Sequence, residues 1–352
     1  MAEKKRIEFI DLAKGICILL VLAVHIVPEL GKRYEMLTCL RMPLYFCLSG
    51  MFFKDYGGIK NLIVKKADKL LLPFFGWYLI SYCFYYFRVF TLGEASEYFH
   101  ILDFFTRPYF YNIPLWFLLS LFWVNLLYCY IIKISDKPYV RIPVVGLFMV
   151  VGWLFSFSEY PNWFFIGTAM TCLPYFCLGR YLADTPVVRR KDKKRDLLTA
   201  LACLCIAGIY VALPENTVSM SYYNNTLESG NIIFFYLVSS SLVILTLLTC
   251  KYIGKLPYIS YLGRFSIIVL VTHELLRNVV NRGILVLFNP DWEELYIDLT
   301  VMFIVTAMMG GVIPLCRKYL PYITAQKEFL TPRFIQRKAE GKETGVTASG
   351  KL

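Results

Sequence analysis

Three side chains that could do chemistry inside a membrane lie in the first apolar stretch of the chain: Asp11, Lys14 and His25. A charged side chain costs roughly 3 kcal/mol or more in a bilayer, so it normally faces the protein interior and marks a functional site. Lys14 and His25 are 11 residues apart, which in a helix places them on one face, about 16 Å from each other. Asp11 comes three residues before Lys14 and can pair with it. The alternative is an interfacial ion pair in which Lys14 snorkels.

A second histidine, His273, lies in a late apolar segment beside Glu274. His25 could be a packing histidine, and two histidines at similar depth could ligate haem or a metal. A metal site needs more ligands at one level, and paired bis-histidine helices are missing, so the sequence predicts no metal. A neutral imidazole is suited to taking a proton from a hydroxyl, which makes His25 the candidate catalytic base.

Other polar positions fall into an outer and an inner group. Arg41 and Trp116 are expected at the outer ends of their segments, near the histidines. The inner group is basic and could bind a phosphorylated cytoplasmic ligand, and its members are Lys14, Lys66, Lys69 and Arg264. The alternative for the loop lysines is that they only report membrane topology.

The elements that must position these residues are membrane helices. Of the 352 residues, 58% are apolar and 18% are charged, against about 45–50% and about 25% in soluble domains. A membrane span needs about 20 mostly apolar residues. Ten segments come near that length: 8–28, 38–53, 70–90, 111–132, 142–158, 163–183, 197–213, 231–250, 258–280 and 295–316. The sequence therefore predicts an all-α polytopic membrane protein with about ten transmembrane helices.

The charged residues predict the orientation and the ends of the membrane domain. Lysine and arginine collect in alternate loops, as in 54–69 and 133–141, whereas 214–230 contains neither, so both termini should be cytoplasmic. This placement indicates topology and not nucleic-acid binding, although the net charge is +12. Residues 1–320 form the predicted membrane domain, and the basic segment 321–352 is expected to be a loosely ordered cytoplasmic tail. The first run lacks a cleavage site and should remain as a helix.

The eleven cysteines indicate no metal or disulfide framework. They are odd in number, mostly inside apolar runs, and contain no Cys-x-x-Cys motif. We expect them to be small packing residues.

Five stretches together resemble integral-membrane acyltransferase family 3, in particular its fucose 4-O-acetylase-like branch. They are RIEFIDLAKGICILLVLAVH, RMPLYFCLSGMFF, KKADKLLLPFF, PLWFLLSLF and YLGRFSIIVLVTHELL, in the order expected for that family. Lys14 and His25 match a basic residue and a histidine with ten residues between them. Arg41 stands where a histidine is common, and Lys66 and Lys69 stand where the family often has arginines.

The resemblance implies a membrane enzyme that transfers an acyl group, most simply acetyl, from cytoplasmic acyl-CoA to a hydroxyl. The acceptor would be a glycan, a lipid-linked saccharide or another envelope molecule in the cell membrane. His25 would be the base or a transient acyl carrier, with Arg41 and His273 orienting the acceptor or stabilising the oxyanion. Trp116 and Glu274 would bind the acceptor, whereas the donor would contact Lys14, Asp11, Lys66, Lys69 and Arg264.

The main rival hypothesis is a transporter or flippase for a lipid-linked sugar, because intramembrane charges are common to both classes. No internal repeat is apparent in the sequence, which weakens that reading. The distinguishing chemistry is consumption of acyl-CoA, which a transporter does not perform.

Overall fold

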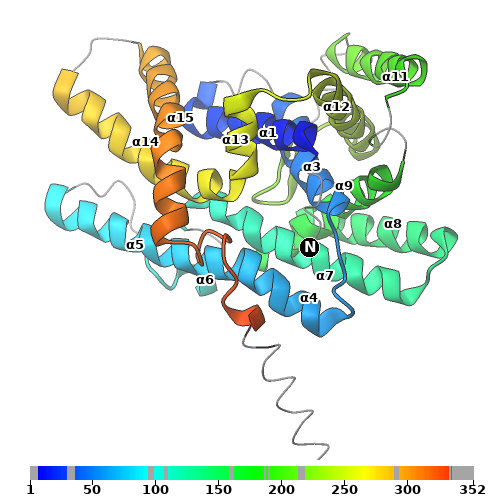
Figure 1. The fold of residues 1–352 in the computed structure, drawn as a ribbon, viewed down its shortest axis with the longest axis horizontal. Coiled ribbons are helices and arrows are strands. Elements are labelled where there is room, and N and C mark those ends of the chain that lie inside the picture. Colours follow the sequence, from blue (N-terminus) through cyan, green and yellow to red (C-terminus); the bar gives the residue numbers. More distant parts are fainter. Residues whose placement is uncertain are drawn as a thin grey trace, which may run out of the picture.

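The structure is a computed structural model that describes residues 7–29, 36–93, 99–106, 110–157, 162–185, 188, 191–212, 219–288, 293–332 and 334. Helices make up nearly all of these residues, which confirms the all-α prediction (Figure 1). The helical elements are α1 Glu8–Ile26, α3 Met36–Met51, α4 Ile59–Lys66, the π-helical turn η1 Ala67–Leu71, α5 Leu72–Leu92, α6 Asp103–Thr106, η2 Ile113–Leu115, α7 Trp116–Ile134, α8 Pro138–Leu154, η3 Phe155–Phe157, η4 Trp163–Phe165, α9 Ile166–Asp184, α11 Lys193–Ala212, α12 Ile232–Ile253, α13 Pro257–Arg264, α14 Ser266–Phe288 and α15 Glu294–Tyr319.

Each of the ten predicted apolar segments contains a helix, but not every helix is a clear membrane span. By length and apolarity, seven helical runs among the described residues could cross a bilayer, and α13 with α14 would make an eighth as one bent span. The helix α3 has only 16 residues, and α9 carries polar side chains along its length. The count of about ten spans and the cytoplasmic location of the termini therefore stay predictions.

Glycines bring two pairs of helices into backbone contact. A Cβ atom on Gly179 of α9 would lie 1.8 Å from the Cys47 carbonyl oxygen of α3, and one on Gly50 of α3 would lie 1.9 Å from the Phe176 carbonyl oxygen. In the same way, a Cβ on Gly15 of α1 would lie 2.0 Å from the Ile259 carbonyl oxygen of α13. Small residues allow this approach between membrane helices. These contacts fix α1 and α3, the helices that carry His25 and Arg41.

The helical run near residue 265 bends sharply. The axes of α13 and α14 differ by 92°, and Phe265 is the single residue between them. As a result α13 lies across α1, and α14 leaves in another direction with His273 in its first half (Figure 1). The sequence predicted one continuous segment over 258–280, and the bend was not expected.

A short β-hairpin interrupts the otherwise helical fold. Strands β1 Ser219–Ser221 and β2 Thr226–Ser229 pair antiparallel within the predicted outer loop 214–230. Hydrogen bonds hold the hairpin to α9 and α8: the Thr168 hydroxyl donates to the Tyr222 carbonyl (2.6 Å), and the Asn225 amide donates to the Gly152 carbonyl (2.7 Å). The turn is therefore fixed to the bundle.

The chain after α15 is also fixed to the bundle. The buried Asp68 carboxylate of η1 accepts hydrogen bonds from the amides of Phe329, Leu330 and Thr331 at 2.7–3.0 Å and from the Thr331 hydroxyl at 2.6 Å. The Trp77 indole donates to the Ile323 carbonyl at 3.0 Å. This segment, 320–332, begins the tail that the sequence predicts to be loosely ordered, and here it packs on η1 and α5. Residues 335–352 of that tail lie outside the described residues.

Candidate active site

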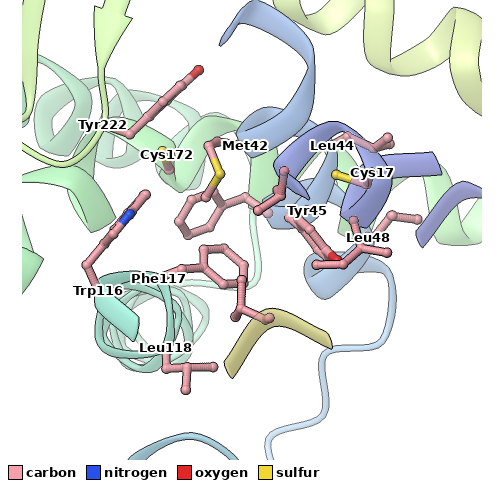
Figure 2. Packing of buried hydrophobic residues seen from close by; sticks show 14 of the residues in the cluster. Cys17, Met42, Leu44, Tyr45, Leu48, Trp116, Phe117, Leu118, Cys172 and Tyr222 are labelled. Carbon is pink, nitrogen blue, oxygen red and sulfur yellow. The ribbon is translucent and has the colours of Figure 1, made fainter. Parts of the chain in front are cut away.

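A cavity of about 130 Å³ lies where α1, α3, α7 and the hairpin meet, and it contains most of the predicted outer site. His25, Arg41 and Trp116 all line it, from three different helices. The hairpin adds Tyr222 and its neighbours. Figure 2 shows the apolar packing beside this cavity, where Trp116 and Phe117 of α7 lie close to Met42 and Tyr45 of α3. The structure thus brings together His25 and Tyr222, which are 197 positions apart in the sequence.

His273 lies directly behind His25. The ring centroids are 5.5 Å apart with an interplanar angle of 56°, and His273 is fully buried. Its Nδ1 is 3.0 Å from the Val269 carbonyl oxygen, which can only accept, so Nδ1 carries the proton. In the neutral ring, Nε2 is then an acceptor, and it has no hydrogen-bond partner among the described residues. His273 does not line the cavity, so its Nε2 is placed to accept a hydrogen bond or a proton from a neighbouring group such as the His25 ring.

Arg277, which the sequence reasoning missed, ties this region together. Its Nη1 donates to the His25 carbonyl at 2.7 Å, and its Nη2 pairs with Glu274 Oε1 at 2.9 Å. Arg277 thereby joins the end of α1 to α14. The sequence did contain a signal for Arg277, because this residue follows His273 by four positions and so falls on the same face of the helix.

Glu274 was predicted to bind the acceptor, but it does not line the cavity. Its side chain is 7% exposed and is engaged by Arg277. With the two histidines it forms the one group of potential metal ligands found among the described residues, with ligand atoms within 4.8 Å of one another. The sequence-based prediction of no metal considered the two histidines as ligands, and the structure adds the Glu274 carboxylate as a third possible ligand.

Arg41 brings positive charge into the cavity wall. Its backbone carbonyl accepts from the Cys17 thiol at 2.8 Å, which fixes the helix position. The guanidinium atoms Nε and Nη1 are buried and have no hydrogen-bond partner among the described residues. The described residues that line the cavity include no carboxylate, so the wall of the cavity supplies no counter-ion for this charge.

The predicted inner basic residues do not line this cavity. The Lys14 ammonium lies 4.8 Å from the centre of the Phe52 ring, the Lys69 ammonium donates to the Ala325 carbonyl at 2.9 Å, and the Arg264 guanidinium lies over the Phe265 ring. Lys66 is partly buried at the end of α4. The predicted Asp11–Lys14 ion pair stays a prediction.

Aromatic residues from the hairpin complete the site. Tyr222 is 3% exposed, its hydroxyl has no partner among the described residues, and burial raises the pKa of this phenol well above its usual value. We predicted no role for this loop from the sequence, because its short polar stretch shows no strong pattern. Only the fold brings the hairpin to the cavity that His25 lines.

Comparison with known proteins agrees with the arrangement. Residues 7–316 match the acyltransferase 3 family, which is described as an acyltransferase domain. No curated protein and no solved structure matches the chain. The family match spans nearly all of the helical bundle, including both histidines and the cavity. The chain belongs to acyltransferase family 3 and is a multi-pass membrane acyltransferase.

Proposed function

We propose that this enzyme transfers an acetyl or similar short acyl group from cytoplasmic acyl-CoA to a hydroxyl of a glycan, a lipid-linked saccharide or another envelope molecule. The observation that carries the proposal is the single cavity lined by His25, Arg41 and Trp116. It combines a base, a guanidinium with two nitrogens that lack a hydrogen-bond partner among the described residues, and an aromatic wall. The proposal includes the fucose 4-O-acetylase-like branch and a location in the cell membrane, as the five sequence stretches suggest.

The reaction needs a base at the acceptor hydroxyl. In the proposed mechanism, the His25 imidazole takes the hydroxyl proton while the hydroxyl oxygen attacks the thioester carbonyl. The carbonyl oxygen becomes an oxyanion, the carbon–sulfur bond breaks, and the CoA thiolate takes the proton from His25. The products are an ester and free CoA. In the two-step version, the acyl group first moves to His25 and then to the acceptor.

Arg41 and His273 have different parts in this scheme. A guanidinium carries only donors, so Arg41 suits the oxyanion. Neutral His273 offers Nε2 as an acceptor, and because it lies behind His25 it would orient the acceptor hydroxyl through the ring of His25. Trp116 and Tyr222 provide aromatic surfaces on which the apolar face of a sugar can pack.

The donor would approach from the opposite end of α1. Lys14 lies on the same helix as His25 at a spacing of about 16 Å, comparable to an extended pantetheine arm. Lys14, Lys66, Lys69 and Arg264 remain the proposed contacts for CoA phosphates, with Asp11 beside Lys14. For Lys69 this role requires release of the Ala325 carbonyl.

The test is release of free CoA by purified protein in lipid, with and without a panel of glycan acceptors. His25→Ala should reduce turnover about 10²–10⁴-fold, because the base or acyl carrier is lost. The matched control is His100→Ala, since His100 is exposed and does not line the cavity. Wild-type turnover in His25→Ala would exclude the assignment of His25. Absence of CoA release by the wild type with every donor and acceptor would favour the transporter hypothesis.

A further inference from the structure

A groove between α11 and α12 lies apart from the histidine cavity, at the edge of the helical bundle (Figure 1). Its volume is about 360 Å³, and it shares no lining residue with that cavity. The helix α11 packs mainly against α12, and its side chains Leu197, Leu198 and Leu201 are exposed. Because α11 has the length and apolarity of a membrane span, these leucines face lipid. Leu197 also lines the groove, so the groove is open to the membrane.

The two walls of the groove follow one face of each helix. On α11 the lining residues run from Lys193 to Ala200, and on α12 they run from Leu245 to Tyr252, both at the i, i+3, i+4, i+7 spacing of a single helix face. The Tyr252 hydroxyl donates to the Asp196 carboxylate at 2.9 Å, so the start of α11 lies beside the end of α12. Seven residues of helix span about 10 Å. The groove is therefore about two turns long, with Lys193 and Tyr252 at one end and Ala200 and Leu245 toward the other.

The end of the groove at Lys193 carries positive charge. The segment RRKDKKR, residues 189–195, contains six basic residues and one aspartate. Lys193 is exposed and makes no ion pair within the part of the chain that the structure describes. The Lys191 ammonium lies 5.5 Å from the centre of the Tyr252 ring, which brings a second cation to the same end. The concentration of lysine and arginine predicts that this end lies at the cytoplasmic surface of the membrane.

The described residues that line the groove include one carboxylate, Asp196, and this group is already paired. Its Oδ2 lies 2.5 Å from the Lys251 ammonium, and both side chains are buried. The Tyr252 hydroxyl donates to the same oxygen. Because Asp196 has its counter-ion inside the protein, it does not neutralise Lys193 or Lys191.

The rest of the groove is mostly apolar. Leu197, Ala200, Leu245 and Leu248 line it, and the small side chain of Ala200 leaves its inner part wide. An apolar channel that opens to lipid and ends in cations at the membrane surface matches a molecule with an anionic head and a hydrocarbon tail. Basic pockets between membrane helices on the cytoplasmic side bind anionic lipid headgroups in this way.

We propose that the groove between α11 and α12 binds one anionic phospholipid of the cytoplasmic leaflet. The lipid phosphate lies at Lys193 with Lys191 nearby, and one acyl chain lies between Leu197, Ala200 and Leu245. Because α12 is the main helical neighbour of α11, the bound lipid adds contacts that hold α11 to the bundle.

The test is photo-crosslinking of the purified full-length protein in discs of zwitterionic phosphatidylcholine that contain a small fraction of phosphatidylglycerol with a diazirine in its acyl chain. Mass spectrometry should find the labels on α11 and α12, and unlabelled phosphatidylglycerol should compete for the site. Lys193→Glu should reduce this labelling about tenfold, because a charge-assisted contact becomes a repulsion. The control is Lys137→Glu, which changes an exposed lysine of another loop with predicted cytoplasmic location and does not alter the groove.

A second variant tests the place of the acyl chain. Ala200→Trp should fill the groove and remove the labelling although Lys193 is intact. Ala202→Trp is the matched control, since Ala202 is exposed on the same helix and does not line the groove. Lys193 and Ala200 lie at the surface of α11, so both variants should purify like the wild type.

Equal labelling of α11 and α12 by diazirine-bearing phosphatidylcholine and phosphatidylglycerol would overturn the proposal, since the headgroup charge would then have no part in binding. Unchanged labelling in both Lys193→Glu and Ala200→Trp would do the same. Displacement of the lipid by an equal concentration of inorganic phosphate would also reject it, because the groove would then recognise free phosphate and not a lipid. None of these measurements requires acyl transfer, so their result is independent of the proposed function.

Discussion

Buried imidazoles and guanidinium groups differ in what they can offer a reacting molecule. The Val269 carbonyl holds the proton of His273 on Nδ1, so the free nitrogen of the neutral ring can only accept. Arg41 offers only donors, and two of its nitrogens lack partners among the described residues. The two residues, which the sequence treats alike as groups that orient the acceptor or stabilise the oxyanion, therefore suit opposite tasks.

Arg41→Ala should lower the kcat of acyl transfer about 10²–10³-fold, because a donor to the developing oxyanion is lost. Arg41→Lys should restore part of the rate, since the charge remains but the forked geometry does not. Steady-state kinetics on purified protein would measure both. Arg282→Ala is the control, because Arg282 is exposed and does not line the cavity. A raised acceptor KM with unchanged kcat would instead place Arg41 in ground-state binding of the acceptor.

Metal removal should leave the activity unchanged. Although His25, His273 and Glu274 lie close enough to share an ion, the Glu274 carboxylate is engaged by Arg277 and His273 Nδ1 by a carbonyl. Activity would be measured before and after dialysis against a strong chelator, together with the metal content of the protein. Loss of activity that Zn²⁺ restores would contradict this prediction and make the three residues a catalytic metal site.

At the scale of elements, helix positions were predictable from apolar runs, and the details of their packing were not. Apolarity places all ten segments because a membrane helix needs a long apolar stretch. The bend at Phe265 and the hairpin depend on tertiary contacts, such as the hydrogen bond from Thr168 to the Tyr222 carbonyl, which connects residues 54 positions apart. In the same way, Lys14 and His25 were recognisable as charges in a membrane helix, but Tyr222 acquires its place only through the fold.

Gly179→Ala should destabilise the protein because its Cβ would collide with the α3 backbone at Cys47. We expect a loss of roughly 1–3 kcal/mol in the free energy of unfolding, as for other overpacked sites. Thermal unfolding in detergent would measure it. The control is Gly146→Ala in α8, where a Cβ meets nothing within 4 Å and helix propensity favours alanine. Equal melting temperatures for the two variants would show that α3 and α9 can separate without cost.

Across the whole molecule, two pockets lie among loops that the charge pattern assigns to opposite sides of the membrane. The histidine cavity is formed by residues with predicted outer location, including the hairpin, whereas a second pocket of about 660 Å³ is lined by Lys54, Lys133 and Arg141 from loops with predicted cytoplasmic location. This grouping supports opposite faces for the two pockets.

Topology can be tested by cysteine labelling with an impermeant reagent in intact cells, in a background without the eleven native cysteines. A cysteine at Asn224→Cys should react, because this residue is exposed in the hairpin turn. A cysteine at Lys194→Cys, which is exposed at the start of α11, should react only after the cells are opened. The reverse pattern would invert the predicted orientation of the protein.

The four hydrogen bonds to Asp68 determine where the chain can be cut. A protein that ends at residue 334 keeps all four donors, whereas one that ends at residue 320 loses them together with the segment that covers Asp68 and that accepts the hydrogen bond of the Trp77 indole. The shorter protein should therefore yield less monodisperse material in size-exclusion chromatography, because the surface of η1 and α5 under this segment is uncovered. If both lengths purify equally, the segment is dispensable; otherwise an affinity tag belongs beyond residue 334.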